Sequence, residues 1–233
     1  MKYKNSALGF VWSLLQPLAY LLIFIMVFKN AFANVERYSL YALVGLVFWT
    51  FFNSTINQML LAIIQNASVL KTMALPKLLF PFSAIVAEVI TFLFSLIPFF
   101  GLMIFFGLRL SPEFILLVPA ILVFVLFTFG LGLTLCTLNV FFRDIGLLWG
   151  TLSPALFYFT PIAYSSALIP EKYAFVLQFN PLVHYITLMR CILYDNVWPS
   201  AQLWFITIAI AVGFVAIGMG VYYKLKNNFV SFY

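Results

Sequence analysis

The chain has 233 residues, of which 65% are hydrophobic and only 8% are charged. A soluble domain carries far more charge, about 25% of all residues on average, and a helix that is hydrophobic on every side cannot face water. The composition therefore excludes a soluble all-α protein. It predicts an all-α integral membrane protein that crosses the bilayer with about six helices.

The charged and metal-binding residue types exclude further classes of protein. The formal net charge is +6, but the basic residues are scattered and form no stripe, so they do not indicate nucleic-acid binding. His184 is the single histidine, and Cys136 and Cys191 lack metal or disulfide spacing. The chain alone is therefore not predicted to hold a metal ion or a haem.

Long hydrophobic stretches divide the chain into spans. Residues 8–28 would form a helix of about 31 Å, which matches the apolar thickness of a bilayer. This stretch is too long for a signal peptide and lacks a small-residue cleavage site. No linker or charge run interrupts the sequence, so residues 1–233 are expected to form one transmembrane domain. The expected spans are residues 8–28, 38–64, 82–106, 114–138, 145–164 and 201–223.

The lysines and arginines set the expected orientation, because cytoplasmic loops of membrane proteins carry an excess of both. With a cytoplasmic N-terminus, one side of the membrane is strongly net positive and the other is nearly neutral. Both termini are therefore expected in the cytoplasm. The positive side carries Lys2, Lys4, Lys71, Lys77, Arg143, Lys224 and Lys226 against Asp144. The other side carries Lys29, Arg37, Arg109, Lys172 and Arg190 against Glu36, Glu113, Glu171 and Asp195.

Residues 66–81, on the expected cytoplasmic side, are too polar and too short to span. Val69, Leu70 and Met73 form an apolar face at helical spacing. Pro76 pushes the preceding residue out of the α region and so ends this short helix. The helix either rests on lipid at the interface or docks into a cytoplasmic partner, and periodicity alone does not separate the two.

Two further segments do not span. Residues 139–144, Asn-Val-Phe-Phe-Arg-Asp, form a cytoplasmic turn in which Arg143 and Asp144 either anchor a hairpin at the headgroups or contact a partner. Residues 165–200 are hydrophobic but interrupted by prolines, which forbid one continuous helix. Broken helices at membrane depth must be buried in protein or line a cavity. This segment is therefore expected to be a re-entrant helical hairpin in the outer leaflet, serving as a gate or as a hydrophobic surface cap.

Three polar residues lie within the expected spans. Glu88 lies about 10 Å deep in the third span by helical rise, and a carboxylate at membrane depth is a candidate functional residue. From there it reaches cytoplasmic water or pairs with Lys77 or Arg143, so a structural pair is favoured over proton coupling. Asn53 and Asn57, one turn apart on the second span, either hydrogen-bond across a helix interface or line a polar path.

Four motifs, in order along the chain, resemble one protein family. The start, Lys-Tyr-Lys-Asn-Ser-Ala-Leu-Gly at residues 2–9, is similar to that of permease subunits of type-2 ABC exporters for polysaccharides. Such proteins export O-antigen, capsular polysaccharide or teichoic acid. Members usually carry a charged amphipathic segment before this start, whereas here Met1 directly precedes it, as expected of a late start or a truncated sequence. The other matching features are Trp12, Pro17, Lys71, Phe80-Pro81, the stretch at 139–144, Asn180-Pro181 and Arg190.

The resemblance implies a transport subunit rather than an enzyme, in the bacterial cytoplasmic (inner) membrane. ATP and Mg²⁺ would bind to a separate ATPase, and the sequence agrees, since it contains no Gly-x-x-x-x-Gly-Lys-Ser/Thr phosphate-binding loop. The permease would act as a homodimer surrounded by membrane lipids, with the path between subunits and two ABC ATPases below it. The residues expected to couple it to the ATPase are Ser68, Val69, Leu70, Lys71, Thr72, Met73, Arg143 and Asp144.

The implied substrate is a polysaccharide, most of all O-antigen, attached to polyprenyl pyrophosphate. Aromatic residues make up 20% of the chain, and their faces offer an apolar surface on which sugar C–H groups can stack. Those on the first and fifth spans, which flank the lipid entry in the family, are candidates for the path, although each also suits lipid contact or helix packing. They are Trp12, Tyr20, Phe24, Trp149, Phe157 and Tyr158. The outer gate would involve Pro161, Pro170, Asn180, Pro181 and Arg190.

Two other functions are open on the sequence. A type-2 ABC permease could instead export a drug or a lipid. A polytopic membrane hydrolase or acyltransferase would use Ser165 or Ser166 with His184 and Asp195, all on the outer side. The sequence has no nucleophile-elbow pattern to support such an enzyme.

Overall fold

The computed structural model describes residues 37–72, 75–105, 111–164, 172 and 174–232, together with Ala19, Leu22, Ile23 and Met26. This part of the chain is helical and contains no strand. Its α-helices are α2 (Tyr38–Gln65), α3 (Ala67–Thr72), α4 (Leu79–Phe105), α5 (Leu117–Phe141), α6 (Asp144–Phe159), α7 (Ala174–Phe179), α8 (Pro181–Leu193) and α9 (Ala201–Leu225). Two 3₁₀ segments, η2 (Pro112–Leu116) and η5 (Lys226–Phe232), adjoin α5 and α9.

Four helices in the described part are long and apolar enough to cross a bilayer. They are α2, α4, α5 and α9, and they overlap the spans expected at 38–64, 82–106, 114–138 and 201–223. The span expected at 8–28 lies outside the described residues, apart from four isolated positions. Helix α4 begins at Leu79, inside the segment expected at 66–81, because Pro81 falls in its first turn, where a missing N–H costs no helical hydrogen bond.

The fifth expected span, 145–164, is helical only as far as Phe159. Helix α6 has 16 residues, a length of about 24 Å, so its length is below that of a full span. The cause is Pro161, which disfavours the α conformation of the residue before it. Thr160 accordingly has extended angles, φ −100° and ψ 125°, and the chain turns over residues 160–164.

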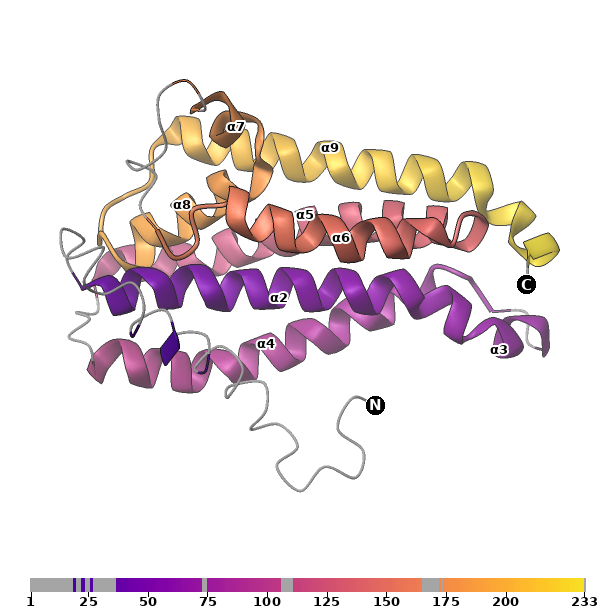
Figure 1. Cartoon of the computed structure of the whole chain (residues 1–233), viewed down its shortest axis with the longest axis horizontal. Helices are drawn as coiled ribbons and strands as arrows, with labels where there is room; N and C mark the ends of the chain where they lie inside the picture. Colours follow the sequence, from indigo (N-terminus) through magenta and orange to yellow (C-terminus); the bar gives the residue numbers. More distant parts are fainter. Residues whose placement is uncertain are drawn as a thin grey trace.

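The non-spanning segments gather at two opposite ends of the bundle (Figure 1). One end, named the α3 end, holds α3, the turn between α5 and α6, and the C-terminus. The other end, named the α8 end, holds α7 and α8. This division agrees with the two groups of segments that the charges predict, since Lys77, Arg143 and Lys226 belong to segments of the α3 end.

Aromatic side chains build the core around α2. In the most apolar stretch of α2, 72% of the residues are buried, against 17% for α9, so α2 is the central helix and α9 a peripheral one. Phe52 of α2 stacks on Phe127 of α5 with ring centroids 5.9 Å apart, and Phe127 stacks on Tyr185 of α8 at 4.8 Å. Such pairs contribute roughly 0.5–1.5 kcal/mol each beyond the area they bury. Part of the high aromatic content therefore serves packing.

Glycines allow α5 and α9 to approach closely. A Cβ atom added at Gly130 of α5 would lie 2.4 Å from backbone atoms of Phe214 and Val215 of α9. A Cβ added at Gly218 of α9 would lie 2.5 Å from the carbonyl oxygen of Gly130. In a lipid environment, where apolar burial does not drive helix association, close backbone packing of this kind holds helices together.

Candidate functional site

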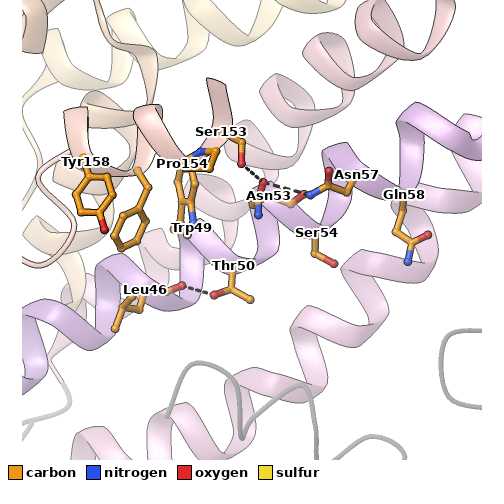
Figure 2. A pocket seen from close by; sticks show the side chains of 11 residues that line it. Leu46, Trp49, Thr50, Asn53, Ser54, Asn57, Gln58, Ser153, Pro154 and Tyr158 are labelled. Carbon is orange, nitrogen blue, oxygen red and sulfur yellow. Dashed lines mark hydrogen bonds between the residues drawn. The ribbon is translucent and has the colours of Figure 1, made fainter. Parts of the chain in front are cut away.

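A groove of about 500 Å³ lies between α2 and α6 (Figure 2). None of its described lining residues carries a formal charge, and apart from Leu46 and Pro154 they divide into aromatic side chains and amide or hydroxyl side chains. Because α2 runs from the α8 end to the α3 end, Trp49 lies nearer the α8 end and Gln58 nearer the α3 end. The lining residues are Leu46, Trp49, Thr50, Asn53, Ser54, Asn57, Gln58, Ser153, Pro154, Phe157 and Tyr158.

Asn53 lies at the centre of the groove and connects its two walls. Its side-chain oxygen accepts a hydrogen bond from the Ser153 hydroxyl of α6 at 2.8 Å and one from the Asn57 amide at 3.3 Å (Figure 2). The Asn57 amide also donates to the backbone carbonyl of Asn53 at 2.8 Å, one turn earlier. Asn53 therefore hydrogen-bonds across the α2–α6 interface, and both asparagines line the groove.

The aromatic half of the groove contains Phe157 and Tyr158 of α6, both expected on the path. Phe157 packs edge-to-face on Trp49 with centroids 5.3 Å apart, and Tyr158 is 71% exposed. Trp149, expected in the same role, lies instead in the core, where it is 5% exposed and contacts the Phe52 ring at 5.9 Å. Trp12, Tyr20 and Phe24 lie outside the described residues.

Sequence reasoning missed most of the α2 wall, although a signal for it exists. Leu46, Thr50, Asn53 and Asn57 follow one another at intervals of four, three and four residues, which places them on one helix face. Trp49 lies beside this row. A polar stripe within a bilayer-length helix is costly unless it serves a purpose, and that pattern would have identified the groove.

Glu88 of α4 contacts the α2 wall of the groove. The carboxylate is buried and accepts a hydrogen bond of 2.7 Å from the hydroxyl of Ser54, a groove residue. Lys77, one partner considered for Glu88, donates instead to the carbonyl of Lys226 at 2.6 Å. Arg143 is exposed at the turn between α5 and α6. Glu88 thus contacts the groove through the Ser54 hydroxyl.

A second polar cluster lies at the α8 end around Arg190 of α8. The side chain is 7% exposed, and its guanidinium donates to the carbonyls of Pro161 and Ile162 at 2.7 and 2.6 Å. It also donates to the Tyr41 hydroxyl at 2.7 Å and lies 3.4 Å from the centre of that ring. Gly45 of α2 makes room for this contact, since a Cβ there would lie 2.6 Å from the Ile162 carbonyl oxygen.

Other polar groups complete this Arg190 cluster. The hydroxyls of Tyr38 and Tyr41 donate to the carbonyls of Ala163 and Tyr164, at 2.8 and 3.1 Å. Burial raises the pKa of the Asp195 carboxyl, and the charge of Arg190 opposes the rise. The turn at 160–164 is therefore held by side chains of α2 and α8.

Two further residues of the expected gate lie at the start of α8. The Asn180 amide donates to the Thr160 hydroxyl at 2.9 Å, while its oxygen caps α8 by accepting from the Leu182 N–H at 3.0 Å. Pro181 occupies the first turn of α8, where no N–H is needed. The structure thus brings four expected gate residues, Pro161, Asn180, Pro181 and Arg190, to one end of the bundle, and Pro170 lies outside the described residues.

The expected coupling residues lie at the α3 end. In α3, Ser68 and Thr72 are exposed, Val69 is half-buried, and Leu70 packs against a cluster of buried side chains beneath it. The Lys71 side chain and Met73 lie outside the described part. Arg143 and Asp144 are exposed at the neighbouring turn between α5 and α6.

Asn139 holds that turn in place, a role that the sequence analysis did not assign. Its amide donates to the Leu60 carbonyl of α2 at 2.9 Å, and its oxygen accepts from the Gly146 N–H of α6 at 3.0 Å.

Two of the residues considered for an enzyme lie at opposite ends of α8, since His184 is in its first turn and Asp195 follows its last residue. His184 of α8 contacts the backbone carbonyl of Gln178 in α7 through Nε2 at 2.9 Å. Ser165 and Ser166 lie outside the described residues. The described residues contain no group of three or more histidine, cysteine, aspartate or glutamate side chains that could hold a metal ion.

Long apolar helices beside a groove lined by uncharged side chains define a polytopic helical membrane protein. The comparison with known sequences gives the family: residues 1–194 match the membrane component of ABC-2 type transporters, and the chain belongs to this family. It is the permease subunit of a type-2 ABC exporter.

The chain is similar over most of its length to curated permeases. It is 31% identical to the O-antigen export system permease RfbA of Klebsiella pneumoniae, over 99% of this chain and 90% of that protein. It is 27% identical to the permease of the same name from Myxococcus xanthus, over 86% and 78% of the two chains. It is 23% identical to the capsule polysaccharide export inner-membrane protein CtrC of Neisseria meningitidis serogroup B, over 84% and 78%.

Proposed function

We propose that this chain forms the membrane path of an ATP-driven exporter that moves polyprenyl-pyrophosphate-linked O-antigen across the bacterial cytoplasmic membrane. The similarity to O-antigen export permeases over nearly the whole chain supports this substrate class. The observation that carries the proposal within the structure is the α2–α6 groove.

The chemistry of the groove suits a neutral sugar polymer. Amides such as Asn57 and Gln58 both donate and accept, as sugar hydroxyls do. Trp49, Phe157 and Tyr158 add ring faces and edges that can pack on the C–H faces of a sugar. A drug or lipid substrate is mostly apolar and would leave the remaining hydrogen-bonding capacity of these amides unused, which is costly at membrane depth. The groove therefore favours a glycan.

The remaining architecture follows from this function. The span expected at 8–28 and the shorter helix α6 complete a permease of six membrane helices. The groove of this permease faces a second copy of the chain in a homodimer. Two ABC ATPases, which bind ATP and Mg²⁺, dock at the α3 end on α3 and on the turn with Arg143 and Asp144. Both termini then lie in the cytoplasm, and the hairpin expected at 165–200 forms the outer gate at the α8 end.

Reconstitution with an ABC ATPase from the same organism tests the function. We expect the two proteins to co-purify, and lipid-linked O-antigen to raise ATP hydrolysis. Asn57→Leu should weaken that stimulation while basal hydrolysis stays, because it removes an exposed amide of the groove. Thr91→Val is the control, since Thr91 is a half-buried polar residue on α4 that does not line the groove. Failure of any ATPase to co-purify would refute the proposal. If only an apolar drug or a free lipid stimulates ATP hydrolysis, the substrate is that compound and not O-antigen.

A further inference from the structure

A cluster of buried side chains closes the bundle at the α3 end. Its centre is Phe229 of η5, which is 0% exposed although it lies after the last spanning helix. The Phe229 ring packs on Phe141, the last residue of α5, at 5.6 Å and on Tyr222 of α9 at 6.1 Å. Leu70 of α3 and Leu78, just before α4, pack against the same cluster. This ring of η5 thus belongs to a cluster that contains residues of α2, α4, α5 and α9.

Lys77 adds a polar tie between the same segments. Its ammonium group donates to the carbonyl of Lys226 at 2.6 Å and lies 5.2 Å from the centre of the Phe229 ring. Lys226 is the C-cap of α9, and the last carbonyls of a helix lack helical donors and carry partial negative charge. Lys77 therefore caps α9 from a distance of 149 residues in sequence. Burial lowers the pKa of the Lys77 ammonium, and the charge of Lys226 lowers it further.

The position of this tie matters because of what it connects. Residues 75–78 precede α4 without forming a helix themselves. Two of their carbonyls accept hydrogen bonds from the start of α4, Pro76 from the Leu79 N–H at 3.0 Å and Leu78 from the Phe82 N–H at 3.1 Å, so movement of this connection is passed to α4. Phe229 touches α5 at Phe141, two residues before Arg143. The tie thus joins the α3–α4 connection to the turn between α5 and α6, the two places where an ATPase would bind.

We propose that Lys77 and Phe229 form a brace that makes α3, the α5–α6 turn and the end of α9 move as one body, so that ATPase motion reaches the spanning helices. This inference rests on the proposed function for its partner, but the brace itself is a property of the permease alone. Lys77 and Phe229 act as positioning residues that touch neither ATP nor the transported glycan.

Two variants, Lys77→Met and Phe229→Leu, test the brace with two measurements. In the first, hydrogen exchange of the permease alone in nanodiscs, both variants should speed exchange of residues 67–78 about fivefold or more, while amides at the centre of α9 stay unchanged. In the second, the complex with its ATPase should assemble and hydrolyse ATP at its basal rate, but glycan-stimulated hydrolysis and export should fall about fivefold or more, as the loss of a typical coupling free energy implies.

Conservative and distant substitutions provide the controls. Lys77→Arg keeps a cationic donor and should retain export, whereas Lys224→Met changes an exposed lysine of α9 and should alter nothing. Unchanged exchange in residues 67–78 overturns the brace, whatever the complex does. Export equal to wild type in both variants overturns it as well, and so does a loss of export that only follows lost ATPase binding. If wild type binds no ATPase, the proposed function fails, and the exchange measurement still decides on the brace.

Discussion

Replacement of Arg190 by methionine should destabilise the α8 end of the bundle. Methionine keeps much of the side-chain volume but removes every hydrogen bond of the guanidinium. The carbonyls of Pro161 and Ile162, which now accept hydrogen bonds at 2.7 and 2.6 Å, would stay buried without these donors. The Tyr41 hydroxyl would also lose the hydrogen bond that it accepts from Arg190. Pro161 cannot compensate by helix formation, because the chain already leaves the helix at Thr160.

The magnitude follows from these three short hydrogen bonds. A hydrogen bond from a charged donor is worth about 1.5–3 kcal/mol net, and each unsatisfied carbonyl costs about 1–3 kcal/mol. The wild-type guanidinium has itself lost its hydration, which offsets part of this gain. We therefore expect Arg190→Met to lower the free energy of unfolding by about 3–5 kcal/mol, in line with the loss of one partner from a buried charged group.

Thermal unfolding of the purified permease in nanodiscs measures this effect. Arg190→Lys should recover only part of the loss, because one ammonium group cannot present the planar fork that reaches two carbonyls and a hydroxyl. Tyr41→Phe should cost about 1 kcal/mol, and less in the Arg190→Met background, because the two residues share a bond. The exposed Arg143, changed to glutamine, should alter stability by less than about 0.5 kcal/mol. Wild-type stability of Arg190→Met, or full additivity with Tyr41→Phe, would refute the cluster as a stabilising unit.

Two other substitutions have clear expected results. Gly130→Val should lower the unfolding temperature and the yield of folded protein, because its Cβ would lie 2.4 Å from the α9 backbone. The expected loss in the free energy of unfolding is about 3 kcal/mol or more. Gly213→Val is the control and should melt like wild type, because a Cβ there would have open space around it. Glu88→Gln should leave export unchanged at all pH values tested, since an amide oxygen can still accept from Ser54; abolished export would instead restore a proton-coupling role for Glu88.

The four long spans could be predicted because their signal is local. A backbone in lipid must satisfy its own hydrogen bonds, so a long apolar run has helix as its available form. The fifth expected span was too long for a related reason. Hydrophobic residues continue to Tyr164, but Pro161 ends the helix at Phe159, and the freed carbonyls are satisfied by Arg190. Hydrophobicity does not reveal that a distant arginine makes an early helix end possible.

The groove could be predicted only in part, because it is made by two helices. Asn53 and Asn57 were identified as polar residues in a span, and this property is visible in the sequence alone. Trp149 and Phe157 look equivalent in sequence, yet one packs in the core against Phe52 and the other lines the groove. The difference depends on which face of α6 meets α2. Contacts with backbone carbonyls, such as that of Lys77 with Lys226, leave no mark in the sequence either.

The attachments of α6 show how the groove can change its width. At the α3 end, Asn139 accepts from the Gly146 N–H, and Trp149 is buried against α2. At the α8 end, the turn that follows α6 is fixed by Arg190. Between these points, the Ser153–Asn53 hydrogen bond and the Phe157–Trp49 ring pair join the walls, and each is worth only about 1 kcal/mol. Because α2 is the most buried of the four long helices, widening the groove costs least if the middle of α6 moves away while both of its ends stay attached.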